Sequence, residues 1–146
     1  MEQKNVLTTG LLVKEMPPVI LDLNNGQGTF LYNHNIQEVD LIEDEGGAPR
    51  VATTDKDKAD ATGKGYLYDS VRVEYPKTAD NIYGTLLSAK YPANTESKLQ
   101  NEYNSAVLGL LDEAAKEPYV AFLSDRLVIR KMVDDDCANY NIPNDL

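Results

Sequence analysis

The sequence predicts an α+β fold, in which an antiparallel β region is followed by two or three α-helices. In the first half of the chain, apolar and polar residues alternate with the two-residue period of strands. After Pro76 the apolar residues recur at the three- and four-residue spacing of helices. We therefore expect a β region over residues 1–75, a helical region over residues 76–136 and an extended tail over residues 137–146.

Three strands are expected in the first 44 residues, at Val6–Glu15, Val19–Asn24 and Thr29–Asp44. Prolines separate the first two strands. The pair Asn25-Gly26 separates the second from the third and supplies the positive φ angles of a tight hairpin turn. The pattern leaves open a break of the third strand near residues 33–35.

Small and charged residues dominate residues 45–65, which predicts a long exposed loop. The next strand is expected at residues 66–75. Because the residues before and after the loop both show the two-residue period of strands, the pattern leaves open that the loop connects the two strands of a hairpin. Alternate residues of this strand form two faces. The inward face is expected to carry Leu67, Val71, Val73 and Tyr75. The opposite face carries Tyr68, Arg72 and Glu74.

The helical region begins at Thr78, which is expected to cap a helix that runs to about Lys90. Pro92 stops this helix. Asn94 or Thr95 is then expected to cap a second helix.

The second helix is weakened or ended by Gly109, and a third begins at Pro118, a residue favoured in the first helical turn. Each helix has one predicted inward stripe. The stripes consist of Ile82, Leu86 and Ala89 in the first helix, Leu99, Tyr103, Ala106 and Leu110 in the second, and Tyr119, Phe122, Leu123, Ile129 and Val133 in the third.

Composition excludes several classes of partner. Fourteen basic residues against twenty-four acidic ones give a net charge of −10, which argues against binding to nucleic acid or to an anionic membrane. The single cysteine, Cys137, cannot form an internal disulfide, which fits a reducing compartment. Nine tyrosines and no tryptophan suit a half-wet protein interface, and equally a core in which tyrosine replaces phenylalanine.

Residues that carry chemistry are few. Gly63-Lys64-Gly65 lacks the spacing and the following Ser or Thr of a phosphate-binding P-loop. His34 is the only histidine and lies far from Cys137 in the sequence, so a zinc site is not expected. A catalytic triad would need His34 as its base, yet no nucleophile signature accompanies it. We expect His34 to be a structural or solvent-facing residue.

Two acidic clusters remain, at Asp134–Asp136 and at residues 38–45. The first lies at a predicted helix C-terminus, where the dipole disfavours negative charge unless a cation or a basic partner compensates it. The alternative is a solvated, frayed helix end. No pair of carboxylates stands out, so the sequence predicts no catalytic, cofactor-binding or metal-binding residue and a protein that is not an enzyme.

Residues 66–136 resemble a known group of proteins. Tyr68–Pro76 reads Tyr-Asp-Ser-Val-Arg-Val-Glu-Tyr-Pro and leads into Thr78–Ile82; Ala89–Pro92 and Leu99–Asn104 follow. This stretch resembles small proteins from phages and prophages of gut Bacteroidales, which share such a strand, a helix and a Lys-Tyr junction before a second helix. The shared motifs are structural, so the resemblance implies no active-site residue.

The resemblance implies a virion protein that is made in the cytoplasm of a bacterial host. The first hypothesis is a structural or accessory component of the particle, associated with a fibre, tail or connector, which forms homo- or hetero-oligomers with other virion proteins. The second is an assembly chaperone that is absent from the mature particle, and the third is a small hydrolase. The predicted interface residues are Tyr68, Arg72 and Glu74.

Overall fold

The computed structural model describes residues 7–43 and 46–145 and confirms the α+β class. The chain divides into two compact units at the residue where the sequence period changes: a sheet unit, Met1–Tyr75, and a helical unit, Pro76–Leu146. The predicted strand ends Val6 and Asp44, the loop residue Glu45 and the tail residue Leu146 lie outside the described residues.

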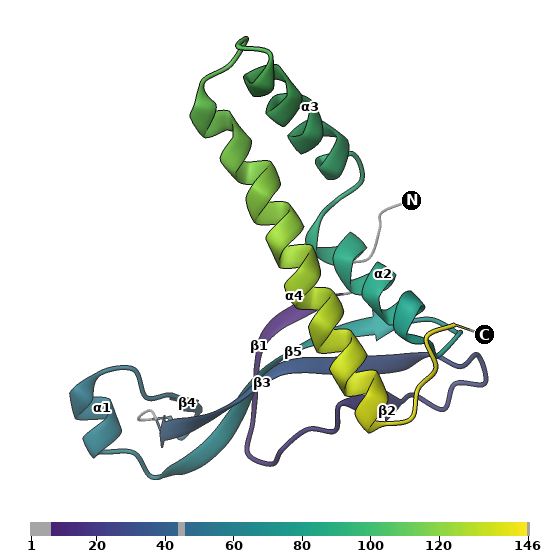
Figure 1. Cartoon of the computed structure of the whole chain (residues 1–146). Coiled ribbons are helices and arrows are strands. Elements are labelled where there is room, and N and C mark those ends of the chain that lie inside the picture. Colours follow the sequence, from purple (N-terminus) through teal and green to yellow (C-terminus); the bar gives the residue numbers. More distant parts are fainter. Residues whose placement is uncertain (1–6, 44–45, 146) are drawn as a thin grey trace. The chain divides into compact units, whose positions relative to one another are not determined.

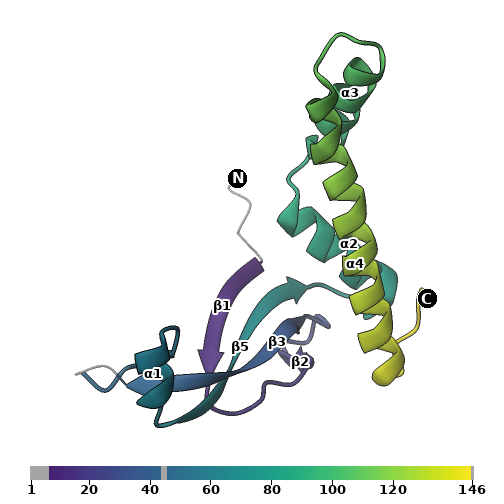
Figure 2. The same cartoon turned by 60° about the vertical axis from the view of Figure 1, so that its left-hand side comes forward.

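The sheet unit is a five-stranded antiparallel sheet (Figures 1 and 2). Its strands are β1 (Leu7–Val13), β2 (Ile20–Asp22), β3 (Phe30–Glu43), β4 (Pro49–Val51) and β5 (Gly63–Val73). Their order is β1-β5-β3-β2, and β4 pairs with β3. The register between β3 and β5 runs from Phe30 opposite Val73 to Leu41 opposite Gly63, so the long hairpin that the sequence left open is confirmed.

Alternation gives the β3–β5 hairpin one apolar and one polar face. The apolar face carries five buried residues, Phe30, Tyr32, His34, Val71 and Val73. The polar face carries exposed charges, among them Lys64, whose Nζ lies 3.2 Å from Glu38 and 3.7 Å from Asp40. The period of two in the sequence therefore identifies both faces.

The predicted break in β3 is a bulge and not the end of a strand. The register with β5 shifts between His34 and Gln37, where Asn35 takes a φ of 51°. Asp69 of β5 binds this bulge because its Oδ2 accepts a 3.0 Å hydrogen bond from Asn35 Nδ2. Its Oδ1 accepts a 3.1 Å bond from the Gly10 amide of β1, so one carboxylate connects three strands.

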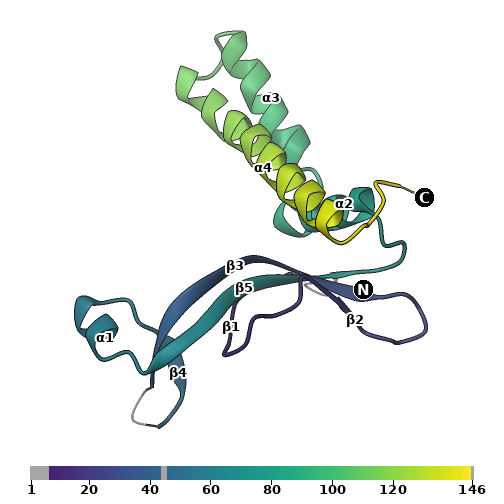
Figure 3. The same ribbon diagram turned by 60° about the horizontal axis from the view of Figure 1, so that its bottom comes forward.

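The segment predicted as an exposed loop, residues 45–65, is mostly exposed where the structure describes it, but it is not a loop throughout. That segment contains β4, the short helix α1 (Asp55–Ala59) and the first residues of β5, and Figure 3 shows β4 and α1 at the opposite end of the hairpin from β2. Thr54 Oγ1 caps α1 by accepting a 3.0 Å bond from the Asp57 amide, and Arg50 pairs with the Asp57 carboxylate at 2.8 Å. α1 buries no residue, so no hydrophobic period announces it.

Tyr75 also departs from its predicted place on the inward face. The strand ends at Val73, two residues earlier than expected, and Tyr75 is 65% exposed. Its ring carbons lie against Gly28, where an added Cβ would stand 3.1 Å away. Once the chain has left the ladder, the strand alternation no longer decides where the side chain points.

The helical unit contains α2 (Ala79–Lys90), α3 (Thr95–Val107), a short 3₁₀ turn η1 (Glu113–Lys116) and α4 (Glu117–Asn139). α2 and α3 both pack on α4 (Figure 1). The buried residues of the helical unit are Ala79, Ile82, Leu86, Ala106, Phe122, Ile129, Val133 and Cys137. The Thr78 cap is confirmed, since Thr78 Oγ1 accepts a 3.2 Å bond from the Asn81 amide.

Both ends of α3 are set by a residue with positive φ. Asn94 precedes the helix with a φ of 74° and makes no side-chain capping bond, so the predicted cap position is right but its mechanism is not. Gly109, with a φ of 80°, ends the helix in a Schellman motif, in which the Leu110 amide donates to Ser105 O at 2.9 Å. Leu110 therefore lies beyond α3 and is 74% exposed, contrary to its place in the predicted stripe.

α4 continues to Asn139, so the prediction of an extended tail from residue 137 is wrong for its first three residues. Cys137 extends the buried stripe by one turn after Val133, while Lys131 pairs with Asp135 at 2.7 Å. The acidic residues of this segment suggested a frayed helix end, but burial of Cys137 and the Lys131–Asp135 ion pair keep it helical.

The chain after α4 returns to the start of the helical unit. The amides of Ala79 and Asp80 donate to the carbonyl oxygens of Pro143 and Asn144 at 2.8 and 3.0 Å. These bonds satisfy two of the otherwise free amides at the N-terminus of α2.

Candidate functional site

His34 is held as a structural residue of the sheet. It is buried, its ring stacks on Tyr32 at 5.0 Å between centroids, and its Nδ1 lies 3.1 Å from Tyr32 O. Asp69 stands opposite it in the register, but Ser70 is opposite Asn33 and belongs to the other face of the sheet. The neighbouring strand therefore does not bring a serine to His34.

The acidic clusters do not assemble a metal site in the part of the chain that the structure describes. Arg130 and Lys131 pair with Asp134 and Asp135 within α4, at 3.1 and 2.7 Å. Cys137, one turn later, is buried, and burial together with the carboxylate of Asp136 raises the pKa of its thiol to about 11. A protonated, buried thiol is a poor nucleophile.

Gly65 of the Gly63-Lys64-Gly65 sequence has a packing role. A Cβ at Gly65 would lie 2.7 Å from Leu41 Cδ1 and 2.7 Å from the carbonyl oxygen of Val13. The glycine thus allows β1 and the Leu41 side chain to approach β5 closely.

The predicted interface residues lie on β5 or just beyond it and contact their own sheet. Arg72 Nε binds Glu74 Oε1 at 2.9 Å, and Glu74 Oε2 accepts a 2.6 Å bond from Thr29 Oγ1. The Thr29 hydroxyl, and then Arg72, hold the pKa of Glu74 below its ordinary value. Tyr68 is half-buried opposite Leu11. That these residues bind another protein stays a prediction.

The helical unit exposes an unusual amount of apolar surface. We call the residues around the α3–α4 connection the apolar tip: Val107, Leu108, Leu110 and Leu111. We call the solvent-facing side of α4 the outer face: Val120, Ala121, Ser124, Leu127 and Val128. Leu108 and Leu110 are each 74% exposed and Leu127 is 73% exposed, whereas soluble proteins normally expose such residues singly.

The outer face makes α4 apolar on two opposite sides. Val120 and Phe122 are two residues apart, as are Leu127 and Ile129, which places the members of each pair on opposite sides of the helix. Phe122 and Ile129 are buried within the unit, but Val120 and Leu127 are not. An amphipathic helix packed on one neighbour has a single apolar stripe, so the second apolar side of α4 is surface that a further neighbour could cover.

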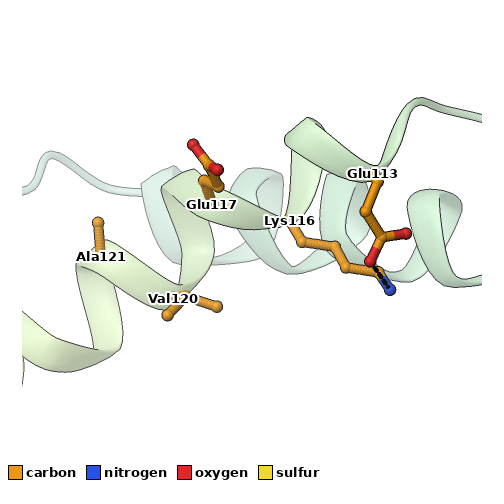
Figure 4. Close-up of a pocket in the computed structure, with 5 residues that line it drawn as sticks. All are labelled: Glu113, Lys116, Glu117, Val120 and Ala121. Carbon is orange, nitrogen blue, oxygen red and sulfur yellow. Dashed lines mark hydrogen bonds and ion pairs between the residues drawn. The ribbon is translucent and has the colours of Figure 1, made fainter.

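A shallow hollow lies at the N-terminal end of the outer face (Figure 4). It encloses about 400 Å³ and is lined by Glu113, Lys116, Glu117, Val120 and Ala121. Lys116 Nζ binds Glu113 Oε1 at 2.8 Å on one side of the hollow. The walls therefore combine two short apolar side chains with three charged ones.

Sequence reasoning missed this surface because it assigned one inward stripe to each helix. The predicted stripe of α4 does not contain Leu127 or Val128, and no predicted stripe contains Leu108 or Leu111. The detectable signal was the presence of large apolar residues on both sides of one helix.

Comparison with protein-family models, with curated proteins and with solved structures finds no match to this chain. Across the described segments no helix, including the 23-residue α4, has the length and apolar character needed to cross a bilayer.

Proposed function

We propose that this protein is a non-enzymatic structural or accessory component of a bacteriophage particle, associated with a fibre, tail or connector. It is made in the cytoplasm of the bacterial host and acts through contacts with other virion proteins. The resemblance of residues 66–136 supports the phage setting. The observation that carries the protein-binding role is the exposed apolar surface of the helical unit.

That surface is unfavourable in water. Each fully buried Leu or Val side chain contributes about 1.5–3 kcal/mol relative to its exposed state. Leu108, Leu110 and Leu127 are mostly exposed in the single chain, so a partner that covers them gains this free energy. Aliphatic residues surrounded by charged ones, such as Asp112 and Glu113 next to the apolar tip, are typical of a binding site for a protein.

The test is quantitative mass spectrometry of purified, salt-washed particles of the phage that encodes the chain. A fixed copy number per particle is expected for a structural component. The double variant Leu108→Asp/Leu110→Asp should lose incorporation, whereas Leu21→Asp, which changes an exposed apolar residue of the sheet unit, should retain it. Stable expression without incorporation of the wild-type chain would contradict the proposal.

The second candidate is an assembly chaperone for a fibre or tail protein. The same apolar surface favours it, because a chaperone must cover the apolar surface of an unassembled client. In that case the chain is absent from particles, and the client fails to fold when co-expressed with the Leu108→Asp/Leu110→Asp variant. A third reading, a small hydrolase, depends on His34, and His34→Ala with unchanged infection would remove it.

A further inference from the structure

We infer that the outer face of α4 binds the same face of a second copy of this chain, with the two helices antiparallel and the two-fold axis at Ser124. The inference rests on the proposed function, in that the apolar surface of the helical unit binds protein, and it names the partner. It follows from the order of residues along the outer face.

The outer face is symmetric about Ser124. Val120 and Val128 each lie four residues from it, and Ala121 and Leu127 each lie three residues from it. These five residues are all exposed and share one side of the helix. In an antiparallel pair centred on Ser124, Val120 of one copy faces Val128 of the other, and Ala121 faces Leu127. A two-fold interface requires this self-complementarity, since every contact occurs twice.

The sizes of the facing side chains also match. Leu127 projects from the helix and is 73% exposed, while Ala121 leaves space in the 400 Å³ hollow (Figure 4). The antiparallel register brings Leu127 and Val128 of the second copy to this hollow, as a knob enters a hole between packed helices. Ser124, which faces its own copy, is small enough for the two backbones to approach closely.

The charges at the two ends of the outer face complete the match. Glu117 lies seven residues before Ser124 and Lys131 lies seven residues after it, and both are exposed. In the antiparallel pair each Glu117 faces the Lys131 of the other copy. The interface therefore gains two ion pairs, each between a carboxylate and an ammonium group. Lys131 already binds Asp135 at 2.7 Å, and its ammonium group has further donors for Glu117. Glu113 and Asp135 also face each other in this register, but each carboxylate is paired with a lysine of its own copy, Lys116 and Lys131.

Sedimentation of the full chain over a range of concentrations tests the inference. We expect a dimer that dissociates on dilution, and Leu127→Glu should weaken it by about 100-fold or more, because the new carboxylate would be buried against Ala121. The control Leu108→Glu, in the apolar tip, should leave the dissociation constant within about threefold. Both sites are mostly exposed, so both variants keep the helical circular-dichroism spectrum. A wild-type chain that stays monomeric, or a dimer that Leu127→Glu does not weaken, overturns the inference.

A charge exchange tests the antiparallel register. Glu117→Lys and Lys131→Glu should each weaken the homodimer by about tenfold, because like charges then face each other twice. A mixture of the two variants should form a heterodimer at least as tight as the wild type, since every facing pair again has opposite signs. Single variants that dimerise like the wild type would rule out this register.

A cross-link locates the axis. Ser124→Cys should form an intermolecular disulfide under mild oxidation, because Ser124 faces its own copy. Ala138→Cys, on the same side of α4 but 14 residues away, should not, and Cys137 does not interfere because it is buried. Cross-linking of Ala138→Cys but not of Ser124→Cys would contradict the inference.

The two proposals can fail separately. A monomeric wild-type chain that is nevertheless incorporated into particles would overturn the self-association and leave the virion role standing. A dimer with these properties that is never found in particles would overturn the virion role and leave the self-association standing.

Discussion

The two units of this protein differ in the polarity of the residues that they expose. The β3–β5 hairpin has one apolar face with buried residues and one polar face on which Lys64 pairs with Glu38 and Asp40. α4 has a buried apolar side and an exposed apolar outer face. The hairpin thus places its exposed charges on the side away from its apolar residues, whereas α4 exposes apolar residues on the side away from its buried ones. If the helical unit binds a protein as proposed, its exposed apolar surface is where we expect the contact.

The largest expected effect on stability comes from a substitution on the buried side of α4. Phe122 is 3% exposed and its ring meets that of Tyr91 edge-on, with the centroids 4.7 Å apart. Phe122→Ala should lower the free energy of unfolding by about 3–5 kcal/mol, because it leaves a cavity in the core. Leu108→Ala should change it by less than about 0.5 kcal/mol. Urea denaturation followed by circular dichroism measures both, and equal losses would show that the apolar tip is part of the core.

The reactivity of the Cys137 thiol measures whether the C-terminal turns of α4 remain folded and keep this side chain buried. Its pKa is raised from 9.0 to about 11, so at pH 8 the folded chain holds about 100-fold less thiolate than the unfolded chain. Alkylation by iodoacetamide should slow by at least that factor on removal of urea. Because the folded pKa is the higher one, the stability that the neutral thiol contributes is complete below pH 9 and is lost as the pH rises toward 11. Equal labelling rates in native buffer and in urea would mean that the end of α4 is open.

Gly65 tests the packing of the sheet unit by the same logic. Gly65→Ala should lower the free energy of unfolding by about 1–3 kcal/mol, because the new Cβ overlaps Leu41 and the carbonyl of Val13. Gly63→Ala is the matched control, since a Cβ there meets nothing within 4 Å. Thermal or urea unfolding distinguishes the two variants. If both behave alike, β1 does not approach β5 as closely as described.

The smallest effect on stability is expected on the polar face of the sheet. Arg72→Ala removes an exposed ion pair with Glu74 and should change the free energy of unfolding by less than about 0.5 kcal/mol. If Tyr68, Arg72 and Glu74 form an interface, the same variant should still reduce incorporation into particles. Unchanged stability together with unchanged incorporation would show that this face is only solvated, and the contrast with α4 would become sharper.

The elements that the sequence predicted are those whose burial is periodic. Burial alternates where β3 and β5 pair near Phe30 and Val73: in β5 the buried residues Val71 and Val73 stand on either side of the exposed Arg72. The Thr78 cap likewise precedes a stripe in which Ile82 and Leu86 are both buried. β4 and α1 were missed because they are held by a cap and by the Arg50–Asp57 pair, which leave no apolar period. The Arg50–Asp57 pair depends on which residues the fold brings together, so the sequence does not indicate it. The Thr54 cap is local, and the spacing of Thr54 and Asp57 is the one signal that could have indicated α1.

The candidate site was hidden for a different reason. The predicted stripe of α4 stopped at Val133 and left out Cys137 on the buried side and Leu127 on the exposed side. A single stripe is the pattern of a helix packed on one neighbour, so the prediction does not include apolar residues on the other side. The absence of a catalytic centre is a prediction from missing motifs.

The bonds from Ala79 and Asp80 to Pro143 and Asn144 give the helical unit adjacent ends. A segment that enters and leaves at one place can be grafted into a surface loop of a carrier protein without stretching that loop. The apolar tip lies at the other end of α4, whose 23 residues span about 35 Å. As a graft, the unit would present its leucines on a stalk of that length, clear of the carrier surface.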